Sequence, residues 1–321
     1  MKKVGLVGLA LLLSFAMLGF AGCRRDGDER VRVRFATGGT AGVYFAYGSA
    51  IAQVLTERAN IELIVQSTGA SRANIQLIQA GEVEIALAQN DVMYHAWHGT
   101  DFFDGVSFRG FGTIAGLYAE VCQVITGPGS GITSIADLRG RRVSVGDVGS
   151  GTEFNARHIL NAHGMTFDDI VVQNLGFGAS ADAFRDGHID AFFATAGAPF
   201  PAIVDLATTR DVVILPLSPD AIVRLQQEFP FYTAYTIPVG TYRGLNTPVP
   251  TVAVKATMLA SNAVSADVVY AITRALFEHQ TEIALGHARG HELDRNYAVA
   301  NLAVPLHPGA ERYFRAAGTI R

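Results

Sequence analysis

Residues 35–55, FATGGTAGVYFAYGSAIAQVL, contain a short apolar run, a break rich in glycine and threonine, and then apolar residues at helical spacing. Residues 142–160, RVSVGDVGSGTEFNARHIL, repeat this order and predict a second helix that begins at Thr152 or Glu153. The start of a helix presents unpaired backbone N–H groups and the positive end of the helix dipole, and glycines let a ligand approach them closely. Two such units facing each other would form a cleft for a small anion.

The rest of the chain continues this alternation of strand, loop and helix. It predicts an α/β fold of mostly parallel sheets, with the loops at the carboxyl ends of the strands collected along one edge. In the first half, strands are expected at 31–36, 61–65 and 83–87, each followed by a helix. In the second half, strands are expected at 142–145 and 189–195, and helices at 153–163 and 181–186.

Three further segments predict how the two halves are joined. Residues 111–125 are expected to form two consecutive strands, residues 252–258 a strand that crosses back, and residues 267–285 one long amphipathic helix. One lobe interrupted by another, with two crossings, implies a hinge. We therefore expect lobe 1 to comprise residues 31–123 and 253–321, and lobe 2 to comprise residues 124–252.

The N-terminus has the pattern of an export signal. Lys2 and Lys3 precede an apolar stretch, and small residues stand just before Cys23. Residues 1–22 resemble a bacterial lipoprotein signal peptide, with cleavage before Cys23 and acylation of its thiol; a retained membrane anchor is the alternative. Residues 23–30 would then be a flexible tether, and the protein would be periplasmic, held at the membrane of the cell envelope by lipid.

Charge and composition exclude several classes of function. The 321 residues carry 25 Lys and Arg against 29 Asp and Glu; loss of Lys2 and Lys3 would leave 23 minus 29, a formal charge of −6. Such a surface argues against a nucleic-acid partner. The sequence lacks G-x-G-x-x-G after the first strand and lacks a P-loop G-K-[ST], so no cofactor is expected. Cys122 would be the one remaining thiol, and one thiol builds neither a disulfide nor a thiolate zinc site.

Five loops at the carboxyl ends of predicted strands consist of small and polar residues, and we expect them to converge on a binding pocket. They are residues 37–40, 67–71, 89–91, 149–152 and 195–197. Arg72, directly after the second loop, is the one cation beside them; it is either an exposed residue at a helix start or the partner of a second ligand carboxylate. The predicted ligand-binding residues are Gly39, Thr40, Tyr44, Ser67, Thr68, Arg72, Gln89, Asn90, Ser150, Gly151, Thr152, Glu153, Thr195, Ala196 and Gly197.

Catalytic and metal-binding patterns are weaker. Ser150 does not fit the nucleophile elbow G-x-S-x-G, because Val148 stands two residues before it, so no catalytic residue and no enzyme activity are expected. His95 with His98, and His287 with His291, have spacings that could hold a metal ion on one side of a helix. Neither pair has a clear third ligand, and no metal site is predicted.

Six segments of the sequence carry a family resemblance. They are TGGTAGVY at 37–44, STGAS at 67–71, AQND at 88–91, ADLRGRRVSVGDVGSGTE at 136–153, DGHIDAFFATAG at 186–197 and IPVGTY at 237–242. In this order and spacing they resemble the TAXI-type solute receptors of tripartite ATP-independent periplasmic (TRAP) transporters. Arg72, Asp147-Val148 and Val239 depart from the residues usual in that family, and Arg72 could alter the ligand.

The resemblance implies a type II periplasmic-binding fold, with two lobes that close on a small organic anion and deliver it to a TRAP permease in the membrane. Known members are similar in binding glutamate, glutamine or related C4 to C5 acids. Two other classes stay open from the sequence. A sensory receptor would use the same fold to feed a signalling partner, and a periplasmic hydrolase would need turnover and a base near Ser150.

Overall fold

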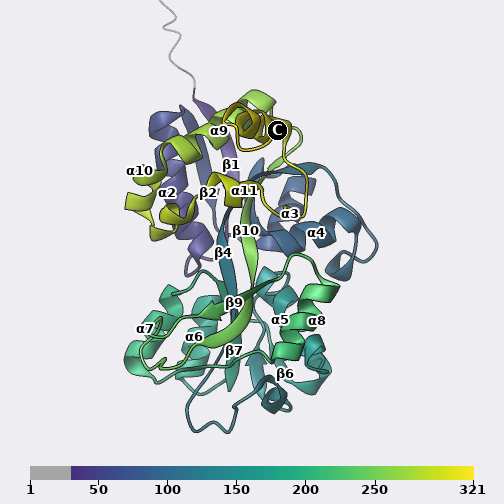
Figure 1. Cartoon of the computed structure of the whole chain (residues 1–321), viewed down its shortest axis with the longest axis vertical. Helices are drawn as coiled ribbons and strands as arrows, with labels where there is room; N and C mark the ends of the chain where they lie inside the picture. Colours follow the sequence, from purple (N-terminus) through teal and green to yellow (C-terminus); the bar gives the residue numbers. More distant parts are fainter. Residues whose placement is uncertain (1–29) are drawn as a thin grey trace, which may run out of the picture. The chain divides into compact units, whose positions relative to one another are not determined.

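Strands and helices alternate along the two halves of the chain in the computed structural model, which describes residues 30–321 (Figure 1). The predicted signal peptide, the lipidation site Cys23 and all of the predicted tether except Arg30 lie outside the described residues. The first half contains β1 (Val31–Ala36), α2 (Val43–Arg58), β2 (Ile61–Gln66), α3 (Ser71–Gln79), β3 (Ile85–Gln89) and α4 (Asn90–His98). The predicted order of three strand–helix units is confirmed, although the third strand lies two residues later than expected.

The second half repeats the alternation after the long strand β4 (Phe111–Thr126). Helix α6 (Phe177–Arg185) begins four residues before its expected start. The elements are β5 (Arg142–Ser144), α5 (Gly151–Ala162), β6 (Val171–Gln173), α6 (Phe177–Arg185), β7 (Ala191–Ala196), α7 (Pro201–Thr209), β8 (Val213–Ile214), α8 (Pro219–Glu228) and β9 (Thr233–Ile237).

The chain then returns through β10 (Val249–Ser261) and ends in helices. These are α9 (Ala266–Glu278), α10 (Gln280–Gly286), α11 (Arg295–Val299) and α12 (Pro308–Ala316), with short 3-10 helices at η1 (Asp101–Phe103), η2 (Ile135–Leu138), η3 (Phe167–Asp169) and η4 (Ala288–Glu292). Among residues 30–321, no helix combines the length and the apolar character that crossing a bilayer requires.

The strands form one sheet in the order β2-β1-β3-β10-β4-β7-β5-β6, with β8 paired to β4 and β9 to β10. β1 with β3, β5 with β6, and β5 with β7 are parallel pairs. β4 and β10 run antiparallel to each other; β10 is also antiparallel to β3 and β9, and β4 is antiparallel to β7 and β8. The α/β class is confirmed, but the sheet is mixed rather than mostly parallel because these two long strands oppose their neighbours.

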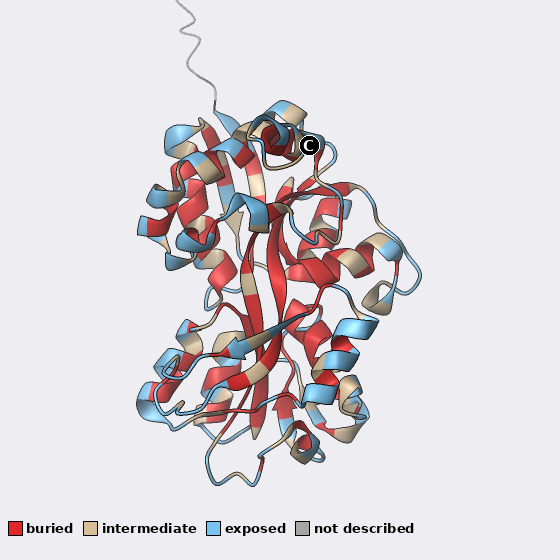
Figure 2. Cartoon of the chain, viewed as in Figure 1, coloured by how far each residue is buried: buried red, intermediate tan, exposed pale blue. Residues whose placement is uncertain are grey.

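Residues 111–126 form one strand, so the prediction of two consecutive strands is wrong. Every residue of β4 is buried except the half-buried Ala119, and β10 pairs with it along most of its length (Figure 2). The register against β10 shifts at two places, leaving Leu117 and Ile114 without a direct partner. Such bulges bend a strand without ending it, so the apolar run continues through the whole core.

The long helix expected at 267–285 is two helices, because the backbone leaves the helical region at His279 (φ −113°, ψ 25°). The amide of His279 still closes the last turn of α9 on the Ala275 carbonyl. In α10, Glu282 accepts a hydrogen bond of 2.7 Å from Arg58 of α2. The change of direction at His279 thus lets the second segment contact α2.

The predicted lobe boundaries fall inside β4 and β10. Val121 of β4 is paired with Ala253 of β10, next to both expected crossing points. On the C-terminal side of Ala253, β10 is hydrogen-bonded to β3. On the other side of this pair, β10 is hydrogen-bonded to β9, and β4 to β7. The division into two lobes stays a prediction, with these two strands as its connections.

Candidate ligand-binding site

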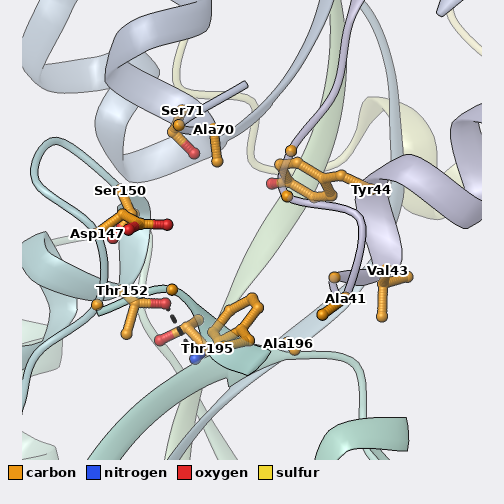
Figure 3. A pocket seen from close by; sticks show the side chains of 18 of the residues that line it. Ala41, Val43, Tyr44, Ala70, Ser71, Asp147, Ser150, Thr152, Thr195 and Ala196 are labelled. Carbon is orange, nitrogen blue, oxygen red and sulfur yellow. Dashed lines mark hydrogen bonds between the residues drawn. The ribbon is translucent and has the colours of Figure 1, made fainter. Parts of the chain in front are cut away.

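A cavity of about 280 Å³ lies where the loops after β1, β2, β3, β5, β6 and β7 meet (Figure 3). The sequence puts these loops together because the carboxyl ends of parallel strands open at the same edge of a sheet. Glu120, from the middle of β4, also lines the cavity. The volume is just below the range for small-molecule pockets, roughly 300 to 1,000 Å³.

Five helices begin at the cavity wall. The residues that precede their first turns, Gly42 of α2, Ala70 of α3, Gln89 of α4, Ser150 of α5 and Gly176 of α6, all line it. Each first turn offers backbone N–H groups without an intrahelical acceptor and the positive end of a helix dipole. Among the described residues, no lysine or arginine lines the cavity. The positive potential there therefore comes from the main chain.

Ser150 is held in place by the first turn of α5. Its hydroxyl oxygen accepts a 3.2 Å hydrogen bond from the Glu153 amide, which leaves its hydroxyl proton to donate. The neighbouring Thr152 accepts from the Thr195 amide at 3.3 Å, a contact drawn in Figure 3 that joins α5 to the end of β7. Glu153 itself accepts from the Gly149 amide at 2.6 Å, so its carboxylate serves the glycine loop.

Glu120 is a buried carboxyl group in this wall, with 3% of its surface exposed. Tyr44 donates a 2.7 Å hydrogen bond to it and Tyr118 a longer one of 3.4 Å. Burial raises the pKa of Glu120 to about 8, because desolvation of the charged form outweighs the bonds from Tyr44 and Tyr118. At neutral pH the group is therefore mostly a neutral acid that can donate a hydrogen bond to a ligand.

Gly151 lets the two sides of the cavity approach each other. A Cβ atom on this residue would overlap the side-chain amide of Gln89, which precedes α4. The Gln89 Oε1 atom is buried and has no hydrogen-bond partner. A second contact between the sides is the 3.0 Å bond from the Arg72 amide to the Gly149 carbonyl.

Ten of the fifteen residues predicted from the sequence line the cavity: Gly39, Thr40, Tyr44, Thr68, Gln89, Ser150, Gly151, Thr152, Thr195 and Ala196. The other five are nearby but outside the lining. Ser67 donates to the Gly38 carbonyl, Asn90 accepts from the Lys255 amide, and Glu153 supports the glycine loop. Gly197 lies against the guanidinium of Arg289.

Arg72, the fifth of these, points to an aromatic cluster. Its guanidinium carbon lies 5.9 Å and 5.7 Å from the ring centres of Phe102 and Phe103. Its aliphatic stem covers Gly149, and its Nε atom is buried without a partner. In this arrangement Arg72 holds η1 and the glycine loop together rather than facing the cavity.

Sequence reasoning missed several cavity residues of chemical interest. Outside the five predicted loops, the missed lining residues are Ala41, Gly42, Val43, Glu120, Gly146, Asp147, Gly176, Phe177, Gly178 and Ala179. Gly38, Gly69, Ala70 and Ser71 lie in those loops but were not among the predicted ligand-binding residues. Glu120 could have been found from its isolated charge inside an otherwise apolar run. Asp147 was visible as a departure from the family pattern, and it lies beside Ser150 in Figure 3.

Within residues 30–321, the two members of each histidine pair differ in exposure. His98 is exposed and bonded through Nδ1 to the Tyr94 carbonyl, whereas His95 is buried. His291 is also exposed, and His287 accepts from the Arg289 amide.

Three solved structures share this arrangement of strands and helices. The periplasmic aliphatic sulphonate binding protein SsuA from Escherichia coli is 15% identical, with a TM-score of 0.50, over 89% of this chain and 83% of that one. A protein from Bordetella bronchiseptica RB50 is 18% identical, with a TM-score of 0.55, over 91% and 90%. The GluR0 ligand-binding core from Nostoc punctiforme, in complex with L-glutamate, is 14% identical, with a TM-score of 0.50, over 81% and 100%.

At such identities the likeness shows the fold alone, and the fold is that of the two-lobed periplasmic-binding proteins. The family is shown by the sequence itself. Residues 35–318 match the NMT1-like family, and the chain belongs to that family.

Proposed function

We propose that this protein is the solute receptor of a TAXI-type TRAP transporter, which binds a small organic acid and delivers it to a membrane permease. The observation that carries the proposal is the cavity into which five helix N-termini open without a basic side chain. Main-chain N–H groups at helix starts bind carboxylates well. The sequence segments at 37–44 and 136–153 add support for the transporter type. Glutamate, glutamine or a related C4 to C5 acid fits the small volume.

The mechanism we propose is closure of the two lobes on the ligand. Gly39, Thr40 and Tyr44 would contact it from lobe 1, and Ser150, Gly151 and Thr152 from lobe 2. A ligand moves an equilibrium between open and closed forms only by its difference in affinity for the two. Contacts contributed by both lobes provide that difference, since they all form only when the lobes are closed.

The ligand can be identified by native mass spectrometry of protein purified without added acids, followed by calorimetry with glutamate, glutamine and C4 to C5 dicarboxylates. We expect one acid to bind with 1:1 stoichiometry and to be recovered unchanged after prolonged incubation. Conversion of the acid to a product would instead support the hydrolase. Absence of binding by every acid tested would refute the proposed substrate class.

The Ser150→Ala variant tests the site, with Ser218→Ala as its matched control. Both serines cap a helix, Ser150 at α5 and Ser218 at α8, where Ser218 accepts from the Ala221 amide at 3.2 Å. Loss of either cap costs a similar amount of stability, about 0.5 to 2 kcal/mol. Only Ser150 lines the cavity, so we expect about tenfold weaker ligand binding for Ser150→Ala alone. Equal affinities in the two variants would show that the ligand binds elsewhere.

The cellular part of the proposal concerns the anchor and the permease. We propose that Cys23 is acylated after signal cleavage and holds the receptor at the membrane of the cell envelope. Labelling with a fatty-acid probe should mark the wild-type protein and not Cys23→Ala, which should move to the soluble fraction. Uptake into vesicles that contain a TRAP permease should require the ligand-bound receptor; a receptor for a signalling partner would not support uptake.

A further inference from the structure

Two histidines and one aspartate from separate elements converge near the aromatic cluster. Within residues 30–321, His95 of α4, Asp101 of η1 and His158 of α5 are the group in which three potential metal-ligand atoms lie within 4.8 Å of one another. The His158 Nε2 atom is 2.8 Å from an Asp101 carboxylate oxygen. None of the three residues lines the ligand cavity.

The imidazole of His95 has an unused nitrogen. His95 is 3% exposed, and its Nε2 atom is buried without a hydrogen-bond partner among residues 30–321. A buried polar atom left unpaired costs roughly 1 to 3 kcal/mol, so such atoms call for an explanation. In the tautomer whose Nδ1 proton is donated to the Thr100 hydroxyl, 2.8 Å away, Nε2 presents a free lone pair.

The second nitrogen of each histidine is fixed by a hydroxyl group. Thr100 holds Nδ1 of His95, and Tyr232 holds Nδ1 of His158 at 3.0 Å. Tyr232 is itself bonded to Asn155, whose amide donates to Asp91 at 2.6 Å. Metal-binding histidines are oriented in this way, with Nε2 free for the ion and Nδ1 held by a neighbouring group.

We propose that His95, His158 and Asp101 form a binding site for a divalent transition metal such as Zn²⁺. Two imidazole nitrogens and a carboxylate oxygen are a ligand set that zinc takes, with a fourth position left for water. Ligands on zinc at a tetrahedral angle are about 3.3 Å apart, so the bonded His158–Asp101 pair would separate slightly and His95 would move inward. The ion would replace the proton that this pair shares.

The proposal differs from the sequence-based expectation of no metal because the third ligand is remote in sequence. His95 lies in the last turn of α4 and Asp101 begins η1 just after it, but His158 lies in the other half of the chain. The packing of α5 brings His158 to His95 and Asp101. Phe229, which follows α8, stacks on the His158 ring with 4.2 Å between the ring centres. The surrounding rings keep bulk water from the site, apart from the one water at the fourth position, and so strengthen metal–ligand interactions.

The test uses untagged protein stripped with EDTA and titrated with ZnCl₂ by calorimetry and with CoCl₂ by visible spectroscopy. We expect one Zn²⁺ per chain and, with Co²⁺, the d–d absorption of a four- or five-coordinate nitrogen and oxygen site. His95→Gln should weaken binding by at least about 100-fold, and Tyr232→Phe, which removes a supporting hydroxyl, by about 10- to 100-fold. No saturable binding in wild type would overturn the proposal.

His98→Gln is the matched control, because it changes an exposed histidine three residues further along α4. It should leave zinc affinity unchanged, and equal effects of the two glutamine variants would also overturn the proposal. His95→Gln should keep its circular dichroism spectrum in EDTA, since the ring loses only its single Nδ1 bond to Thr100. Zinc should raise the melting temperature of the wild type and of Ser150→Ala, but not that of His95→Gln.

Discussion

Glu120 and Asp147 are the two acidic residues of the cavity, and their environments differ. Glu120 is buried in β4 and bonded to Tyr44, whereas Asp147 is exposed in the loop after β5. A neutral Glu120 would donate a hydrogen bond to the proposed ligand without repelling an anion. Asp147 places a carboxylate at the entrance, where it would discriminate between ligands by their charge.

Replacement of Glu120 by glutamine should alter the pH dependence of stability. The raised pKa of Glu120 means that, between its ordinary value of 4.5 and about 8, the unfolded chain has released a proton that the folded chain keeps. Stability contributed by this group is therefore lost as pH rises through that window. The wild type should lose unfolding free energy between pH 5 and pH 8.5, and Glu120→Gln should not. We therefore expect the unfolding free energy of the variant, relative to that of wild type, to rise by about 1 to 3 kcal/mol over this range. Urea unfolding at a series of pH values measures this; a difference that does not vary with pH would contradict it.

Replacement of Asp147 by asparagine should change ligand preference. We expect the affinity for dicarboxylates to rise and that for amino acids, which carry an ammonium group, to fall, each by about threefold to tenfold. Calorimetry with succinate and with glutamine, side by side, measures the two changes. Equal shifts for both ligand classes would mean that Asp147 does not contact the ligand.

At the scale of elements, the packing of α2 on β1 determines where the first glycine loop lies. Gly48 provides the close approach: a Cβ there would lie 2.7 Å from Thr37 Cγ2 and 3.1 Å from the Phe35 ring. Glycine is otherwise unfavourable inside a helix by about 1 kcal/mol. Its presence in the middle of α2 therefore reflects this contact.

Two effects on stability oppose each other in the Gly48→Ala variant. Helix propensity favours alanine by about 1 kcal/mol, and overpacking against β1 costs about 1 to 3 kcal/mol. We expect the clash to win and the midpoint of urea unfolding to fall. Ser49→Ala, the next residue along α2, is half-buried and should change stability little. A Gly48→Ala protein as stable as wild type would show that β1 and α2 can move apart freely.

The elements that sequence patterns predicted well are those with a local signal. Glycine loops and apolar spacing locate α2 and α5, and these two segments supply six of the ten predicted residues that line the cavity: Gly39, Thr40, Tyr44, Ser150, Gly151 and Thr152. Errors arise where tertiary contacts decide. Pairing with β10 keeps β4 continuous, and contact with α2 redirects the chain at His279. Arg72 turns to Phe102 and Phe103, a cluster that no local pattern reveals.

At the scale of the whole molecule, the proposed closure would depend on contact between the two sides of the cavity. We expect the proposed ligand to reduce the radius of gyration in X-ray scattering. Gly151→Ala should prevent this reduction and weaken binding at least about tenfold, because its methyl group overlaps Gln89.

The double variant Gln89→Ala with Gly151→Ala removes the overlap and should restore the ligand-induced compaction. Gly127→Ala is a suitable control, since its Cβ would meet only Phe184 at an ordinary 3.6 Å. Compaction of Gly151→Ala equal to that of wild type would contradict the proposed closure.

The dominance of main-chain groups around the cavity has an evolutionary consequence. The backbone amides at the starts of α2, α3, α4, α5 and α6 are retained after most point mutations, because replacing a side chain leaves the backbone in place. Selectivity would then depend on a few side chains, such as those of Tyr44, Glu120 and Asp147. We expect a library randomised at these three positions to retain binders of organic acids while the preferred acid changes, so one scaffold could supply receptors for many nutrients.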